Sequence, residues 1–190
     1  RLGDIICSSI GLVILSPLFL VFSILMKLED PKGPIFFSQT RIGLNEKPFK
    51  MYKIRSMVTN AEELLEDLLD ENEVEGAMFK MKEDPRVTKI GKTIRKFSID
   101  ELPQLWNVIK GDMSLIGPRP PLEREVAEYT TYDKQRLLIK PGCTGLWQVS
   151  GRNDLGFDEM VELDMKYIKN LSLRTDLFIL VKTVWVMLKP

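Results

Sequence analysis

The chain has 190 residues, enough for one compact domain with a hydrophobic core. Its 27 Lys and Arg residues balance 27 Asp and Glu residues, and this neutral total argues against a protein that binds nucleic acid through bulk charge. The chain has no histidine, so acid–base chemistry must use Asp, Glu, Lys, Tyr or Cys. Cys7 and Cys143 lie far apart in the sequence, which predicts no metal cluster or disulfide framework and fits a reducing compartment.

An uncharged segment of 22 residues, Ile5 to Met26, lies near the start of the chain. As a straight helix it would be about 33 Å long, enough to cross the core of a bilayer. A cleaved signal peptide does not fit, because the residues after Met26, KLEDPKGPIF, offer no small-residue cleavage site. A buried core helix stays an alternative, although the segment is long for one. We therefore predict insertion into a membrane.

Pro17 follows Ser16 in the middle of this segment and predicts a kink, because proline removes one helix hydrogen bond and clashes with the preceding turn. A kinked helix can still span the membrane, or it can return to the side from which it entered. The charges that flank the segment have both signs on both sides and do not set the orientation. From the residues alone, the spanning and re-entrant alternatives stay open.

Two short stretches, Pro34–Gly43 and Lys47–Met57, mix β-branched, aromatic and basic residues in alternation and predict a pair of strands. The following segment, Glu62–Glu75, carries eight acidic residues and leucines at helical spacing. It predicts an amphipathic helix whose apolar stripe packs on the domain or binds a partner, such as a second copy of the chain. A homodimer is therefore possible but not required.

A basic amphipathic helix is expected over Asp84–Phe97, where four apolar residues recur at 3-4-3 spacing and basic residues occupy the other faces. Its basic face suits an anionic lipid surface or a phosphate ligand, and a merely solvated face is the alternative. Residues 91–93 read GKT, but they form no P-loop, because Arg86 stands where the first glycine should be.

The rest of the chain predicts two more helices and one loop. Glu123–Leu138 is polar and helical in pattern, and Lys140–Asn153 is a glycine-punctuated loop with Trp147 expected to be exposed. Leu173–Lys189 has an apolar run too short to span a membrane, flanked by Trp and Lys, which suits a helix lying in the membrane interface or a core helix. With no internal repeat or low-complexity linker, we expect one domain.

The stretch Phe97–Asn107, FSIDELPQLWN, places Asp100 and Glu101 side by side. One interpretation is a helix start, because Ser98 and Glu101 have the spacing of a capping box and acidic residues favour a helix N-terminus. Pro103 fits that interpretation only if Asp100 is the N-cap residue. The other interpretation is a catalytic pair of carboxylates, and both stay open on these residues alone.

Basic residues elsewhere in the chain favour the catalytic interpretation. Arg95 lies five residues before Asp100, Arg119 is held between prolines in GPRPP, and Lys53 and Arg55 come from YKIRSM. Arginine binds phosphate through two parallel hydrogen bonds, and a carboxylate can attack phosphorus or hold Mg²⁺. A chain without histidine that combines these groups is equipped for phosphoryl transfer.

The chain resembles the bacterial sugar transferases, which are monotopic phosphoglycosyl transferases. The resemblance covers nearly all 190 residues and is carried by four motifs in order: the apolar segment with Ser16-Pro17, YKIRSM, DPRVTKIGKTIRKFSIDELPQLWNVIKGDMSLIGPRP and PGCTGLWQVSGRN. Motifs of this length and order are highly specific.

This resemblance implies an enzyme that moves a sugar-1-phosphate from a UDP-sugar to undecaprenyl phosphate and releases UMP. It implies that Asp100 is the nucleophile of a covalent phosphosugar intermediate and lies near a Mg²⁺ cofactor, and that Glu101 supports catalysis. The basic residues assigned to phosphate or substrate binding are Lys53, Arg55, Arg95 and Arg119.

The resemblance also implies a location and a fold. The apolar helix would be re-entrant, broken at Ser16-Pro17, and the active site would lie at the cytoplasmic face of the bacterial inner membrane. The expected fold is α+β and mostly helical, with a re-entrant helix hairpin over residues 1–28 and a catalytic part over residues 29–190 that contains amphipathic interfacial helices and a small β element.

The longer segment from Thr59 to Glu83 and the motif GCTGLWQVSGRN are more similar to the larger family members, which carry extra N-terminal membrane helices. The start at Arg1 would then fit a catalytic portion. Those members mostly transfer hexoses such as glucose or galactose in the first membrane step of exopolysaccharide, capsule or O-antigen synthesis. Two rivals are a glycosyltransferase that releases UDP and a membrane-anchored, non-catalytic assembly protein of polysaccharide export.

Overall fold

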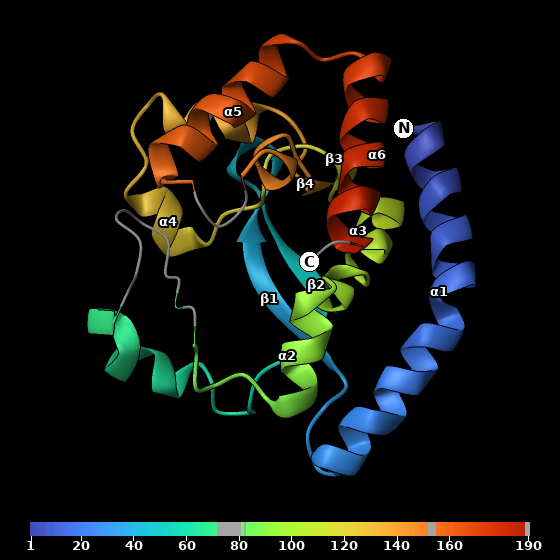
Figure 1. The fold of residues 1–190 in the computed structure, drawn as a ribbon. Helices are drawn as coiled ribbons and strands as arrows, with labels where there is room; N and C mark the ends of the chain where they lie inside the picture. Colours follow the sequence, from blue (N-terminus) through green and yellow to red (C-terminus); the bar gives the residue numbers. More distant parts are fainter. Residues whose placement is uncertain (72–80, 82, 152–154, 189–190) are drawn as a thin grey trace.

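The computed structural model describes residues 1–71, 81, 83–151 and 155–188. Within these ranges the fold is mostly helical, with two small sheets, as expected for an α+β protein (Figure 1). The helices are α1 (Leu2–Glu29), α2 (Lys89–Lys96), α3 (Gln104–Lys110), α4 (Glu123–Ala127), α5 (Phe157–Lys169) and α6 (Leu173–Leu188). The strands are β1 (Phe36–Ile42), β2 (Pro48–Ile54), β3 (Ser114–Ile116) and β4 (Gly142–Thr144).

The longest helix, α1, continues through Ser16 and Pro17, and its two halves run in different directions (Figure 1). Pro17 has no N–H to donate to the carbonyl of Val13, four residues earlier. The Ser16 hydroxyl donates to that carbonyl instead, at 2.8 Å. The bend agrees with the expected kink, but the helix does not reverse as a hairpin would. Re-entrant insertion stays a prediction.

Most of the surface of α1 is apolar and exposed. Among the described residues it is the one helix long and apolar enough to cross a membrane, and 6% of its most apolar window is buried inside the protein. This low burial excludes the alternative of an ordinary core helix. Both ends of α1 are tied to the domain: Arg1 donates to the carbonyls of Val108 and Ile109, and Glu29 accepts from the N–H of Lys89 at the start of α2.

The strands β1 and β2 form the predicted antiparallel pair, in a register that places Phe36 opposite Ile54 and Ile42 opposite Pro48. Side chains alternate along a strand, so Phe37, Gln39 and Arg41 share one face of the sheet, and Lys53 joins them from β2 opposite Phe37. The second sheet, the short parallel pair of β3 and β4, was not predicted.

Several elements differ from the sequence-based expectation. The polar stretch 123–138 is not one helix: α4 ends at Ala127, and a 3-10 helix begins at Asp133, where Thr130 and Asp133 exchange side-chain to backbone hydrogen bonds. Trp147 is buried rather than exposed, in a 3-10 turn that contacts α5 and α6. The basic helix is shorter than expected.

The acidic segment forms a 3-10 helix over Glu63–Glu71, and the remainder of its predicted helix lies outside the described residues. Of its leucines, Leu65 is buried, whereas Leu64 and Leu69 are exposed.

In the C-terminal helix α6, Ile179 is fully buried, whereas Phe178 and Trp185 are exposed. The C-terminal helix therefore packs one face on the core and leaves an apolar face open.

Candidate active site

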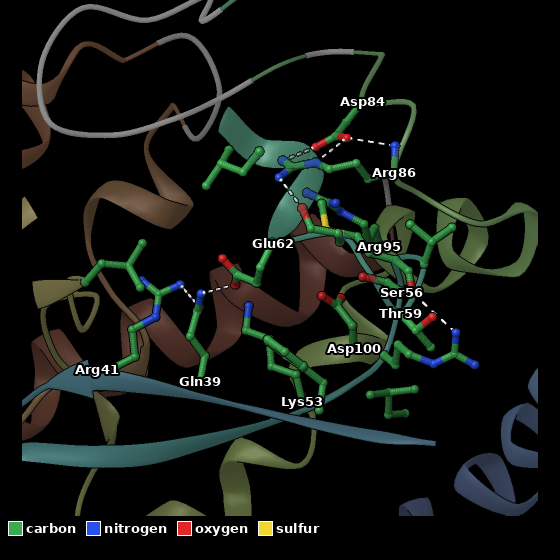
Figure 2. A pocket seen from close by; sticks show the side chains of 18 of the residues that line it. Gln39, Arg41, Lys53, Ser56, Thr59, Glu62, Asp84, Arg86, Arg95 and Asp100 are labelled. Carbon is green, nitrogen blue, oxygen red and sulfur yellow. Dashed lines mark hydrogen bonds and ion pairs between the residues drawn. The ribbon is translucent and has the colours of Figure 1, made fainter. Parts of the chain in front are cut away.

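A cavity of about 390 Å³ lies between the β1–β2 sheet, α2 and the loop that precedes α4 (Figure 2). Five of the six side chains that the sequence assigned to catalysis or phosphate binding line it: Lys53, Arg55, Arg95, Asp100 and Arg119. These residues come from β2, the end of α2, a turn before α3 and the loop after β3. The fold thus gathers groups that are far apart in the sequence.

Asp100 and Glu101 lie in a 3-10 turn, Ile99–Glu101, between α2 and α3. Ser98, just before it, has a left-handed backbone with φ of 54°, a conformation that costs a non-glycine residue on the order of 1 kcal/mol. Ser98 makes no side-chain capping hydrogen bond, and α3 begins only at Gln104. The capping-box interpretation of this stretch is therefore wrong.

The two carboxylates of the pair have different surroundings. Asp100 is 8% exposed and lines the cavity, and within the described part of the chain no basic group forms an ion pair with it inside 4.0 Å. Burial raises the pKa of Asp100 to about 6, helped by the charge of Glu101 and opposed by Lys53 and Arg95. Near neutral pH this carboxylate is ionised, so it can act as a nucleophile.

Glu101 forms an ion pair with Lys53, with 2.8 Å between Oε1 and Nζ. Burial acts to raise the pKa of Glu101, but the charge and hydrogen bond of Lys53, followed by the charges of Arg119 and Arg41, hold it below its usual value. Lys53 lies next to Asp100 in the middle of the cavity (Figure 2). Glu101 therefore positions the ammonium group of Lys53 beside the Asp100 carboxylate.

The three arginines assigned to phosphate binding differ in their contacts. Arg95 is exposed on the last turn of α2 and lines the cavity, and Arg119 is held by Glu125 at 3.0 Å and 3.4 Å. Arg55 instead donates to Asp30 and to the Pro34 carbonyl, at 2.9 Å and 2.7 Å, and so ties the end of α1 to β2. This geometry favours a structural role for Arg55.

The sequence analysis did not single out Gln39, Arg41 or Glu62, which also line this cavity. Arg41 donates to Gln39, at 2.8 Å, and Gln39 donates to Glu62, at 3.1 Å, so a chain of hydrogen bonds runs along one side of the cavity (Figure 2). The alternation of polar side chains in the predicted strand was the signal that could have found Gln39 and Arg41.

A second cavity, of about 170 Å³, reaches Glu101. Its walls are mostly apolar and come from α3, β4 and α6, with Leu102, Leu105, Leu180 and Val186 among them. Because Glu101 lines this cavity and its partner Lys53 lines the first, their ion pair lies where a polar and an apolar cavity meet. Ser16 and Pro17 line neither of the two cavities.

The described residues include no group of three His, Cys, Asp or Glu side chains that would hold a metal ion by themselves. Mg²⁺, however, is commonly held by one or two carboxylates together with substrate phosphates and water. The Asp100 carboxylate, without an ion-pair partner among the described residues and inside a polar cavity, fits that mode of binding.

Comparisons with known proteins identify the family of this chain. The family model described as "Bacterial sugar transferase" matches residues 1–190. A "Galactosyl transferase CpsE" of Streptococcus agalactiae is 50% identical over 99% of this chain and 42% of its own length. An "Undecaprenyl-phosphate galactose phosphotransferase" of Salmonella typhimurium is 47% identical over the whole chain and 40% of its own length.

The "Exopolysaccharide production protein ExoY" of Rhizobium meliloti is 43% identical over 97% of this chain and 83% of its own length. The chain thus spans about two fifths of the first two relatives and most of the third. A family model that covers every residue, and a relative matched over most of both chains, confirm the resemblance seen in the sequence. This chain belongs to the bacterial sugar transferase family.

Proposed function

We propose that this chain transfers a sugar-1-phosphate from a UDP-sugar to undecaprenyl phosphate, with release of UMP. The observation that carries the proposal is the position of Asp100, a buried carboxylate without an ion-pair partner in the described part of the chain, in a cavity that Lys53, Arg95 and Arg119 also line. The names of the relatives support a phosphotransferase that uses the lipid undecaprenyl phosphate, and two of them support galactose as the sugar.

In the first step, an oxygen of Asp100 attacks the sugar-bearing phosphorus of the donor. The bond between that phosphorus and the bridging oxygen breaks, the electron pair stays on UMP, and the phosphosugar remains on Asp100. Lys53 and Arg95 neutralise charge on the transferred phosphate. Mg²⁺, when bound beside Asp100, would supply further neutralisation of phosphate charge.

In the second step, a phosphate oxygen of the lipid attacks the same phosphorus, and the oxygen of Asp100 leaves as a carboxylate. The apolar cavity at Glu101 supports this step, because it offers hydrocarbon surface beside the reacting groups. UMP leaves before the lipid reacts, so we expect ping-pong kinetics.

The exposed apolar surfaces of α1 and α6 support association with a membrane, where the lipid substrate lies. We place the protein at the cytoplasmic face of the bacterial inner membrane, with α1 inserted as a re-entrant helix, in the synthesis of exopolysaccharide, capsule or O-antigen. One relative is named for exopolysaccharide production, which supports that role.

The test is product release. Purified protein is incubated with Mg²⁺, undecaprenyl phosphate and a panel of UDP-sugars, and the released nucleotide is identified. We expect UMP with UDP-galactose, abolished in Asp100→Asn and unchanged in Asp158→Asn, an exposed aspartate on α5. Release of UDP would indicate a glycosyltransferase, and no nucleotide from any sugar would indicate a non-catalytic assembly protein.

A further inference from the structure

Arg41 is a buried cation whose hydrogen bonds are incomplete. It is 7% exposed and lines the polar cavity from β1. Its Nη1 donates to the Pro120 carbonyl at 3.1 Å, and its Nη2 donates to Gln39 Oε1 at 2.8 Å. Both acceptors are neutral, and the buried Nε has no hydrogen-bond partner. A guanidinium has five N–H donors, so three of them remain available.

The charges around Arg41 have both signs. Burial, together with the charges of Arg119 and Arg124, lowers the pKa of Arg41 to about 10, and the charges of Glu125 and Glu101 act in the opposite direction. Of these two carboxylates, Glu101 is bound to Lys53. The nearby carboxylate of Glu125 already has other partners: it accepts hydrogen bonds from Arg119 and from the Leu122 N–H, the latter at 2.9 Å. Glu62 reaches Arg41 only through Gln39. Within the described residues, Arg41 has no ion-pair partner within 4.0 Å.

A buried charge without a charged partner is costly, and the cost is relieved when an oppositely charged ligand completes the site. Arg41 lines the same cavity as Asp100, so the anion that would complete its site can be part of the substrate. In Figure 2, Arg41 lies to the left of Lys53 and Asp100 whereas Arg95 lies above Asp100, so the cavity offers basic groups in two directions from Asp100. A pyrophosphate-linked donor has two phosphates to place, one on each side of the bond that breaks.

We infer that Arg41, together with Arg119, forms a subsite for the phosphate of the departing nucleotide, separate from the Arg95 side that holds the transferred phosphosugar. This inference rests on the proposed function. As the bond to the bridging oxygen breaks, the electron pair passes to the phosphate of UMP, which gains negative charge without needing a proton. The fork of Arg41 donates to that phosphate as its charge develops.

The two steps of the reaction separate this role from a structural one. The nucleotide is present when the phosphosugar enzyme forms and when UMP converts it back to UDP-sugar, but it is absent when the lipid phosphate accepts the sugar. Loss of the Arg41 donors therefore slows the first two processes and leaves the third unchanged. A merely structural role for Arg41 would affect all three.

The experiment compares Arg41→Met and Arg41→Lys in the full chain with Arg174→Met, an exposed arginine on α6 far in sequence from the cavity residues. Intact-protein mass spectrometry follows formation of the phosphosugar enzyme, its discharge by UMP and its discharge by undecaprenyl phosphate. We expect Arg41→Met to slow formation and UMP discharge by about 100-fold, with lipid discharge within twofold of the unmodified protein. The rates of formation and UMP discharge in Arg41→Lys should lie between those of Arg41→Met and the unmodified protein. Arg174→Met should leave all three rates unchanged.

Equal rates in all variants, or an equal loss in all three processes, would overturn the inference. Should Arg41→Met not fold, Arg41→Lys decides by the same criterion. A binding measurement keeps the inference separate from the proposed function: in an Asp100→Asn background, calorimetry with UMP and with uridine isolates the phosphate contribution. Arg41→Met should weaken UMP binding at least tenfold and leave uridine binding unchanged. An unmodified protein that forms no phosphosugar enzyme would overturn the proposed function alone.

Discussion

The Nζ of Lys53 lies 2.8 Å from Oε1 of Glu101, and this ion pair joins strand β2 to the turn that carries Asp100. This ion pair gives the two adjacent carboxylates, Asp100 and Glu101, different surroundings and different roles. Glu101 is bound to Lys53 and has a lowered pKa, whereas Asp100 has a raised pKa and faces the polar cavity. A reactive carboxylate and a positioning carboxylate therefore arise from neighbouring residues with different partners.

Lys53→Met should slow formation of the phosphosugar enzyme by about 100-fold, because it removes the cation beside Asp100. It also leaves Glu101 partly buried without its partner, so the pKa of Glu101 should rise. Lys53→Arg should recover part of the rate. The matched control is Lys50→Met, an exposed lysine on the same strand that bonds to Thr40. An unchanged rate in Lys53→Met, measured by rapid-quench mass spectrometry, would contradict this role.

The rate of phosphosugar enzyme formation should depend on pH through Asp100. Its pKa is raised to about 6, so the nucleophile is largely protonated at pH 5 and ionised at pH 8. We expect the rate at donor concentrations far below KM, which reports the pKa of the free enzyme, to rise with pH and reach half its maximum near pH 6. Glu101→Gln should move this midpoint to lower pH, because the charge of Glu101 helps to raise the pKa of Asp100. A rate that is already maximal at pH 5 would be inconsistent with the buried nucleophile.

Asp100→Asn should stabilise the protein at high pH. The pKa of Asp100 is about 6 in the folded chain, against an ordinary value of 3.8, so the folded state binds the proton more tightly. The protonated carboxyl stabilises the fold below pH 3.8, and that contribution is lost as the pH rises to about 6. The difference corresponds to at most about 3 kcal/mol of unfolding free energy.

Denaturant unfolding of Asp100→Asn and the unmodified protein at pH 4 and pH 8, without Mg²⁺, tests this expectation. The variant should be more stable at pH 8, and the difference should shrink towards pH 4. A variant that is less stable at pH 8 would show that the carboxylate contributes favourably to the fold.

The fold was predictable where a local pattern decides it. The alternation in residues 34–57 predicted the β1–β2 pair, and the apolar run predicted α1. The pattern failed where side-chain contacts override it: Thr130 and Asp133 interrupt the expected helix. The β3–β4 pair depends on glycine contacts between distant segments, such as Gly142 against Gly117, which no local pattern shows.

The site was predictable in its chemistry but not in its connections. The sequence pointed to Asp100 and to basic residues, and the fold brings most of them to one cavity. It could not show that Arg55 bonds to Asp30 or that Lys53 pairs with Glu101, because each contact joins residues from separate elements. Arg41 was missed because its alternation with Gln39 along the strand shows that the two share a face, but not that this face lines a cavity.

The apolar cavity at Glu101 makes a separate prediction about the lipid substrate. Val186 lines this cavity, whereas Val184 on the same helix is 58% exposed. Val186→Trp should fill the cavity and raise the KM for undecaprenyl phosphate about 10-fold or more, without slowing UMP release in the absence of lipid. Val184→Trp adds the same bulk outside the cavity and should leave both unchanged. An equal effect of the two variants would place the lipid elsewhere.

The most direct test of the central claim is the intact mass of the protein after incubation with Mg²⁺ and UDP-galactose, without lipid. We expect one hexose phosphate to be attached to Asp100, located by peptide mapping, together with release of an equal amount of UMP. Addition of undecaprenyl phosphate should then restore the original mass. No change in mass, with UMP released only once the lipid is present, would contradict a covalent intermediate on Asp100.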